Sequence, residues 1–196
     1  MGDYLIGGSN FMKKIIGLLV TIFVLFIGII SGCLDNDPGE PINVVNELDA
    51  VRYAGLWYSV YEIPIFYGFY PFGYSSVDCI NSTATYTVES ENTIHVLNRC
   101  IYRGKERIVE GTARYANSSV KNGALIVKLF GFDSDYNVIG LDDEYQWAVI
   151  GTKNRESLWL FSRTPTIGTP LLDEMKNIAE SEGFDTSQLV KVKREL

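Results

Sequence analysis

The sequence has little of the two residue types that build most zinc sites. It contains one histidine, His95, and three cysteines in 196 residues, and these do not form a spaced Cys/His cluster. A single histidine without such a cluster supports neither a zinc centre nor a Ser-His-Asp triad. We therefore predict no metal site, no resident cofactor and no catalytic residues.

Positive charge is also scarce. Lysine and arginine total 17 against 24 for aspartate and glutamate, which gives a formal net charge of −7. Without a stripe of basic residues, the chain is a poor candidate for binding nucleic acid. With 46% of its residues hydrophobic, it has enough material for one domain with a sizeable core and hardly enough for two.

The first 32 residues are predicted to lie outside the folded domain. Lys13 and Lys14 precede an uncharged apolar run at 15–30, and small residues follow directly before Cys33. This order of basic, apolar and small residues is typical of a secretory signal. Its end, Ile-Ser-Gly-Cys, is similar to a bacterial lipobox, in which the cysteine is acylated and begins the mature protein. We therefore predict a signal peptide with a lipobox at 1–32 and lipidation of Cys33.

Two features of this segment stay open. Met12 is a second candidate start, which would make residues 1–11 an upstream extension. With the two small residues that follow it, this run forms an uncharged stretch of eighteen residues at 15–32, which is also long enough to cross a bilayer as an uncleaved signal anchor. Either interpretation tethers the chain to a membrane outside the cytosol, at the outer membrane or the cell surface. The polar stretch 33–45 is interpreted as a flexible tether, and residues 46–196 as the domain.

The domain consists largely of short segments in which apolar and polar residues alternate. Such segments, rich in Val, Ile, Thr, Tyr and Phe, are typical of strands. The eight candidates are 55–61, 83–89, 93–102, 106–116, 124–131, 137–141, 145–152 and 157–163. Eight antiparallel strands joined by short turns suit closure into an up-and-down barrel, whose interior can hold a small ligand. The predicted fold class is therefore all-β.

One helix is predicted after the eighth strand. Pro170 suits a first helical position, Leu172 and Met175 lie on one apolar stripe, and Gly183 suits the end of the helix. A helix with one apolar stripe must cover a surface, and the outer barrel wall provides one. Residues 188–193 are a candidate edge strand.

An aromatic loop separates the first two predicted strands. Such a long loop is more often a functional lid than a spacer. The alternative is a satellite hydrophobic cluster that only seals the barrel end. The aromatic residues of this loop are Phe66, Tyr67, Phe69, Tyr70, Phe72 and Tyr74.

Cys79 and Cys100 flank a predicted hairpin whose turn falls near residue 91. Because the two positions are nearly symmetric about this turn, and disulfides persist outside the cytosol, a cross-strand disulfide is expected. A free pocket thiol and a pair of inert buried cysteines are the alternatives.

Three longer motifs follow one another along the domain. Residues 49–58 contain Gly-Leu-Trp, residues 136–145 run from Tyr-Asn-Val-Ile to Leu-Asp-Asp-Glu-Tyr, and residues 158–165 contain Arg163. Their content and order resemble the lipocalin family, specifically its bacterial outer-membrane lipoprotein branch. Shorter matches extend the resemblance over residues 46–192.

The resemblance implies an eight-stranded antiparallel calyx with a C-terminal α-helix packed on the outside. It implies that Trp57 lies at the inner base and that Arg163 covers it, closing that end of the barrel. The implied activity is binding and carrying small hydrophobic molecules, which for the bacterial branch are fatty acids and lysophospholipids. The chain departs from that branch at Ser59 and Glu62, where the family commonly has Glu and then Arg, so a partner for an anion is missing.

The inward faces of the strands predict the lining of the lumen. Side chains alternate between the two faces of a barrel strand, and the family's inward positions set the phase. The predicted ligand-binding residues are Ser59, Tyr61, Ala84, Tyr86, Val96, Asn98, Val127, Leu129, Ile139, Ile150, Trp159 and Phe161, with Val109, Ala113, Asn137 and Ala148 on the same faces. Interleaved small residues favour an open cavity, and the alternative is a lumen filled by the bulky residues.

The remaining polar motifs have simpler interpretations. Alternation along its strand predicts that His95 faces outward. The acidic residues 142–144 are better explained by a turn between two strands than by a cation site. Asn81 and Asn117 begin glycosylation patterns, which matter only in a host that glycosylates.

The leading hypothesis is a membrane-tethered protein that binds, stores or transports a small hydrophobic molecule, such as a fatty acid or lysophospholipid. The second is an enzyme that acts on a lipid-like substrate through a pocket cysteine. The third is an envelope protein with a filled barrel and a structural or partner-binding role.

Overall fold

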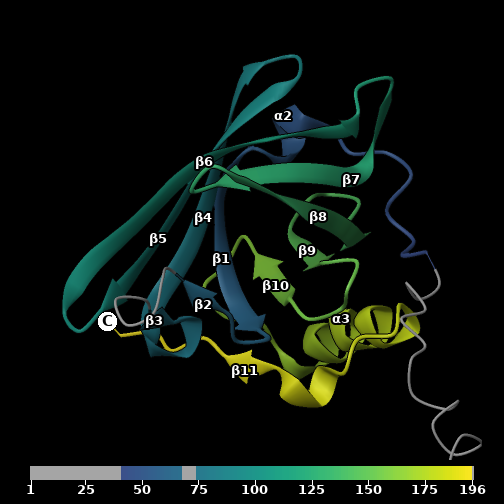
Figure 1. The fold of residues 1–196 in the computed structure, drawn as a ribbon. Coiled ribbons are helices and arrows are strands. Elements are labelled where there is room, and N and C mark those ends of the chain that lie inside the picture. Colours follow the sequence, from purple (N-terminus) through teal and green to yellow (C-terminus); the bar gives the residue numbers. More distant parts are fainter. Residues whose placement is uncertain (1–40, 68–73, 196) are drawn as a thin grey trace, which may run out of the picture. The chain divides into compact units, whose positions relative to one another are not determined.

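The computed structural model describes residues 41–67 and 74–195, which contain one closed antiparallel barrel (Figure 1). Each barrel strand pairs with its neighbours along the chain, and β10 pairs with β1 to close the sheet. The eight barrel strands are β1 (Gly55–Glu62), β4 (Cys79–Ser90), β5 (Thr93–Tyr102), β6 (Lys105–Asn117), β7 (Val120–Leu129), β8 (Phe132–Leu141), β9 (Trp147–Gly151) and β10 (Leu158–Ser162). The predicted fold class is confirmed.

Short elements flank the barrel. The chain enters through the helix α2 (Ala50–Tyr53), and a two-stranded sheet of β2 (Phe66–Tyr67) and β3 (Tyr74–Ser75) lies between β1 and β4, followed by the 3-10 helix η1 (Ser76–Asp78). After β10 come the helix α3 (Thr169–Ser181), the 3-10 helix η2 (Thr186–Gln188) and the short strand β11 (Val190–Lys191). Since β11 pairs with β1, the predicted edge strand is present in shortened form.

Alternation along the strands separates an inner from an outer face. On β5, Ile94 and Val96 are buried, whereas His95 between them is only half-buried and lies 3.8 Å from the carboxylate of exposed Glu110. The inner face of the barrel carries the larger buried cluster, which includes Trp57. This is the arrangement expected when a two-residue side-chain period meets a closed sheet.

The helix α3 covers the outside of the barrel against β8 and β9 (Figure 1). Its buried residues Met175 and Ala179 join a second cluster outside the barrel. The helix ends where Gly183 adopts φ +83°, and Phe184 N donates to Ala179 O at 3.1 Å. Glycine accepts this left-handed conformation without steric cost, which is why Gly183 predicts the helix end correctly.

The C-terminal segment is fixed to the outside of β1 and β4 by Arg194. Its guanidinium lies 4.9 Å from the Tyr58 ring and donates to Ser59 O and Ser82 O at 2.8 and 3.1 Å. Asn81 holds the adjacent backbone of Glu195 through both ends of its amide. This arginine contact is not predictable from the sequence, because nothing near residue 194 marks its partners.

The folded part begins a few residues earlier than composition predicts. Asn43 contacts Glu182 through its backbone N–H at 2.8 Å, and Val45 N donates to Val138 O at 2.9 Å. The end of the predicted 33–45 tether is therefore attached to the barrel. Residues 40–196 form one compact unit with its own core, and such a unit can fold alone.

In the described ranges, no helix is both long and apolar enough to cross a membrane. The predicted signal peptide and Cys33 lie outside the described residues.

Candidate functional site: a one-ended cavity inside the barrel

Arg163 and Trp57 lie together at one end of the barrel. The guanidinium carbon is 3.7 Å from the centre of the indole ring, and Trp57 is fully buried. The arginine also donates five hydrogen bonds to backbone carbonyls, those of Arg52, Tyr53, Ala54, Leu56 and Tyr145. Partial burial lowers the pKa of Arg163. This is the closed end that the two motifs implied.

Three buried tyrosines form the next layer. The Tyr136 hydroxyl lies 2.7 Å from that of Tyr53 and 2.9 Å from that of Tyr86. Burial raises the pKa of all three phenols, so they are neutral and can share hydrogen bonds. Since Tyr86 and Tyr136 also line the cavity, this cluster forms its floor.

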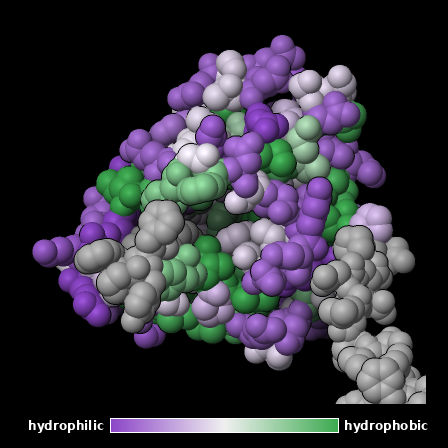
Figure 2. Space-filling model, in the orientation of Figure 1, coloured by the Kyte–Doolittle hydropathy of each residue, from purple (hydrophilic) through white to green (hydrophobic). Residues whose placement is uncertain are grey.

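Above the floor, the barrel encloses a cavity of about 270 Å³. It is open at the end opposite Arg163, and Figure 2 shows a recess near the centre of the molecule with apolar and polar side chains around it. Its apolar lining includes Tyr86, Val96, Val127, Trp159 and Phe161. A mostly apolar cavity with a few polar groups is the usual form of a small-molecule site.

Most predicted lumen residues line this cavity. They are Ser59, Ala84, Tyr86, Val96, Asn98, Val127, Leu129, Trp159 and Phe161, together with Val109. Ile150, Ala113 and Ala148 point inward but belong to the packed inner cluster and do not line the cavity.

Tyr61 was expected in the lumen and is not there. Ser59 pairs with Phe161 and Tyr61 with Leu160, so Val60 is an extra residue that forms a bulge in β1. A bulge shifts the alternation by one position. Tyr61 therefore packs in the outer cluster, and Glu62 faces the lumen instead.

The predicted inward positions on β8 are also wrong, because the two faces of this strand are exchanged: Asn137 and Ile139 were expected to face the lumen and do not. Tyr136 and Val138 belong to the inner cluster, whereas Ile139 packs in the outer cluster near α3. Asn137 pairs with Gly151, and its side-chain amide donates to Gly151 O at 3.2 Å. The pairing of β8 with β7 and β9 sets this phase, and it is not visible in β8 alone.

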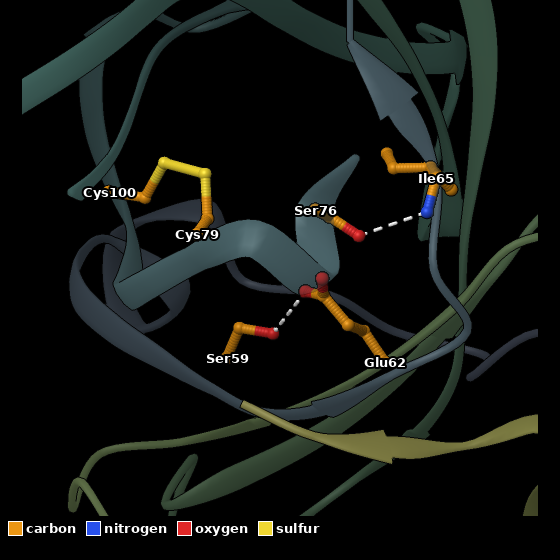
Figure 3. The surroundings of a disulfide bond; sticks show 6 residues. All are labelled: Ser59, Glu62, Ile65, Ser76, Cys79 and Cys100. Atoms are coloured by element: carbon orange, nitrogen blue, oxygen red, sulfur yellow. Dashed lines mark hydrogen bonds between the residues drawn. A yellow bond between two sulfur atoms is a disulfide. The ribbon is translucent and has the colours of Figure 1, made fainter. Parts of the chain in front are cut away.

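A polar corner of the cavity contains Ser59, Glu62 and Ser76 (Figure 3). Ser59 Oγ donates to Glu62 Oε2 at 3.0 Å, and Ile65 N donates to Ser76 Oγ at 2.9 Å. Burial raises the pKa of the Glu62 carboxyl, and the neighbouring Ser76 and Ser59 hydroxyls offset part of this effect. The sequence marked Glu62 only as a departure from the family, since simple alternation points it outward.

Cys79 and Cys100 form a disulfide beside this corner (Figure 3). Their Cα atoms are 5.5 Å apart on the neighbouring strands β4 and β5. The cross-strand disulfide is confirmed, and the free pocket thiol is excluded for both of these cysteines.

The open rim carries exposed aromatic side chains. Phe130 and Phe132 flank the β7–β8 turn next to Leu129, and they are 59% and 66% exposed. Phe66 of the predicted lid is 54% exposed beside the cavity residue Ile65. Of the other lid residues, Tyr67 and Tyr74 pair through their backbones, and Phe69, Tyr70 and Phe72 lie outside the described residues.

Two other predicted motifs lie away from the cavity. Asp142 accepts hydrogen bonds from the backbone of Glu144 and Gln146, which makes residues 142–146 a turn between β8 and β9. Of the two glycosylation candidates, Asn117 is exposed, whereas Asn81 is bonded to Glu195.

A family model described as a lipocalin-like domain matches residues 48–194. The chain belongs to the lipocalin family. Among curated lipocalins it is 35% identical over 184 residues to the outer membrane lipoprotein Blc of Citrobacter freundii, covering 92% of this chain and 98% of that protein. It is 32% identical over 160 residues to temperature-induced lipocalin-1 of Arabidopsis thaliana, covering 78% and 82% of the two chains.

Solved lipocalin structures share the fold at low sequence identity. Insecticyanin from the tobacco hornworm Manduca sexta superposes with a TM-score of 0.60 at 15% identity, covering 79% of this chain and 85% of that one. Lobster apocrustacyanin A1 gives a TM-score of 0.59 at 14% identity, covering 81% and 91%. These likenesses establish the calyx architecture alone.

Proposed function

We propose that this lipocalin binds a small single-chain amphiphile in the barrel cavity and stores or transports it. The observation that carries the proposal is the cavity itself, about 270 Å³ of mostly apolar lining closed by the tyrosine layer. This volume is near the lower end for small-molecule sites, which favours one alkyl chain over two. Membership of the family supports a hydrophobic ligand. Fatty acids and lysophospholipids are the proposed class.

We also propose that the barrel is held in the cell envelope by a lipid on Cys33. The lipobox-like sequence before Cys33 supports this placement. So does the identity of 36% over 169 residues to the protein named outer membrane lipoprotein Blc of Escherichia coli (strain K12), which covers 85% of this chain and 90% of that protein.

A binding role is favoured over the two alternatives. The disulfide occupies Cys79 and Cys100, so neither supplies the free thiolate that a cysteine nucleophile requires. A barrel filled by its own side chains would leave no cavity, whereas this one holds space beside Val109 and Val127.

The proposal is tested with two neighbouring residues on β6. Val109 lines the cavity, and Glu110 is exposed on the outer face. The assay uses the fragment of residues 40–196. In this fragment, we expect Val109→Trp to weaken binding of the neutral dye N-phenyl-1-naphthylamine by at least about tenfold, because the indole occupies the space that the ligand needs. The control Glu110→Trp should bind like the parent. The proposal is wrong if the parent shows no saturable binding, or if Val109→Trp binds as well as Glu110→Trp.

A further inference from the structure

Glu62 is the one buried carboxylic acid among the described residues, with 4% of its surface exposed. Its side chain lies on the inner face because of the β1 bulge, and it lines the cavity. A buried carboxylate is costly unless hydrogen bonds or an opposite charge compensate it. The partners of this carboxylate therefore indicate what the cavity is built to receive.

The two carboxylate oxygens of Glu62 differ in their partners. Oε2 accepts the hydrogen bond from Ser59 at 3.0 Å, whereas Oε1 is buried and accepts none from the described part of the chain. Ser76 lies beside the carboxyl, as Figure 3 shows; its oxygen accepts from Ile65 N, and its hydroxyl hydrogen is still available to turn toward the carboxylate. The corner thus presents one buried carboxylate oxygen that has only a neutral hydroxyl near it, in a region of the cavity that is otherwise largely apolar.

No cation of the described chain pairs with this carboxylate. Two arginines line the cavity, and Arg99 forms its ion pair with Glu106 at 3.0 Å while Arg107 lies 5.6 Å from the Tyr102 ring. On the other side of Glu62, Lys191 of β11 and Lys193 line a small adjacent space together with Glu62. Neither lysine belongs to an ion pair of the described residues, so they leave the carboxylate unpaired.

The other titratable groups on the cavity do not supply a positive charge either. Asp135 accepts from Asn137 and from the backbone of Lys153. Tyr86 and Tyr136 bond to each other. The described ion pairs do not include Glu62.

We propose that Glu62, assisted by Ser59 and Ser76, binds the protonated amine of a single-chain amphiphile whose alkyl chain fills the apolar cavity. An ammonium supplies both the missing hydrogen-bond donor and the missing charge, so its bond to the carboxylate is stronger than that of a neutral hydroxyl. A fatty-acid carboxylate has neither property and is repelled by Glu62. The inference rests on the proposed function: it keeps the single-chain amphiphile and, within the proposed class, favours lysophospholipids with an amine in the head group over fatty acids.

The position of the corner gives the ligand a direction. Ile65 and Ser76 belong to the β1–β4 connection at the open end, whereas Tyr86 and Phe161 lie toward the closed half with the inner cluster. The amine therefore lies near the mouth, and the chain extends toward the tyrosine floor.

The test compares dodecylamine, dodecanol and dodecanoic acid, which differ only in the head group. Each displaces N-phenyl-1-naphthylamine from residues 40–196 at pH 7.5. We expect the amine to bind at least about tenfold more tightly than the acid, with the alcohol between them. Glu62→Gln should reduce amine binding to the level of the alcohol and strengthen acid binding. The control Glu110→Gln removes an exposed carboxylate and should keep the parent order.

Each outcome separates the inference from the proposed function. The inference is overturned if the parent binds the acid as tightly as the amine, or if Glu62→Gln keeps the amine preference. In both cases the proposed function stands, provided that Val109→Trp still weakens binding of all three probes. If the parent binds none of the probes and no dye, the proposed function fails as well. If Glu62→Gln folds poorly, the relative affinities of the parent for the amine, the alcohol and the acid decide whether the inference stands.

Discussion

Replacing Arg163 with lysine should destabilise the barrel strongly although it keeps the charge. Arginine presents its donors in a rigid planar fork, and here they bind five backbone carbonyls around the closed end. Lysine has one nitrogen on a flexible stem, and it cannot reach the carbonyls on both sides of Trp57 or lie flat on the indole.

The magnitude follows from what lysine loses. We count at least two hydrogen bonds to a charged donor at about 1–1.5 kcal/mol each, using low values because the guanidinium is partly exposed. Loss of the stacking on Trp57 adds about 0.5–1 kcal/mol. Arg163→Lys should therefore lower the free energy of unfolding by about 3 kcal/mol, a large share of the stability of a single domain.

The assay is urea unfolding of residues 40–196, followed by tryptophan fluorescence. The control is Arg99→Lys, since Arg99 is an exposed residue with one ion pair to Glu106, and it should change stability by less than about 1 kcal/mol. Dye binding should persist in folded Arg163→Lys, because neither Trp57 nor Arg163 lines the cavity. A stability loss no larger than that of the control would refute the reasoning.

Two further predictions concern the open half of the barrel. Replacing Cys79 and Cys100 together by serine should cost about 3 kcal/mol in the same urea assay, because the disulfide closes a loop with a sequence separation of 21; an unchanged midpoint would contradict this. Glu62→Gln should raise the stability of the empty protein at pH 8 by about 1–2 kcal/mol, because it removes a buried, incompletely bonded carboxylate. Since burial raises the pKa of Glu62 above 4.5, the folded protein binds this proton more tightly than the unfolded chain, and the parent loses stability as pH rises from about 4.5 through the raised pKa. The gain in Glu62→Gln should thus shrink toward pH 4, and a gain that is equal at pH 4 and pH 8 would exclude the carboxyl as its cause.

Local patterns predicted the closed end of the barrel and the helix well. The motifs around Trp57 and Arg163 resemble those of the lipocalin family, and this resemblance implied the stack that the structure shows between the two side chains. Gly183 marked the helix end through its backbone conformation, and the near-symmetric cysteines marked a strand pair. In each case the signal is a short motif or a single residue type that can be recognised without knowing the strand register.

The candidate site was less predictable, and Glu62 shows why. Alternation from Ser59 places Tyr61 in the lumen and Glu62 outside, whereas the bulge at Val60 exchanges them. The bulge exists because β10 offers one residue opposite two of β1, so it is a property of the pair of strands. On β8, the phase that separates Val138 from Ile139 is likewise set by neighbouring strands.

The sequence by itself determined the fold class, because strand alternation, turn residues and the apolar stripe of the helix are local patterns along the chain. It also determined that the interior would be mostly apolar. Only the tertiary structure decided that the lumen is open, that its acidic group is Glu62, and that Arg194 fixes the C-terminal segment to the barrel. These features depend on register and on contacts between residues distant in the chain, where a shift of one position moves a side chain to the opposite face.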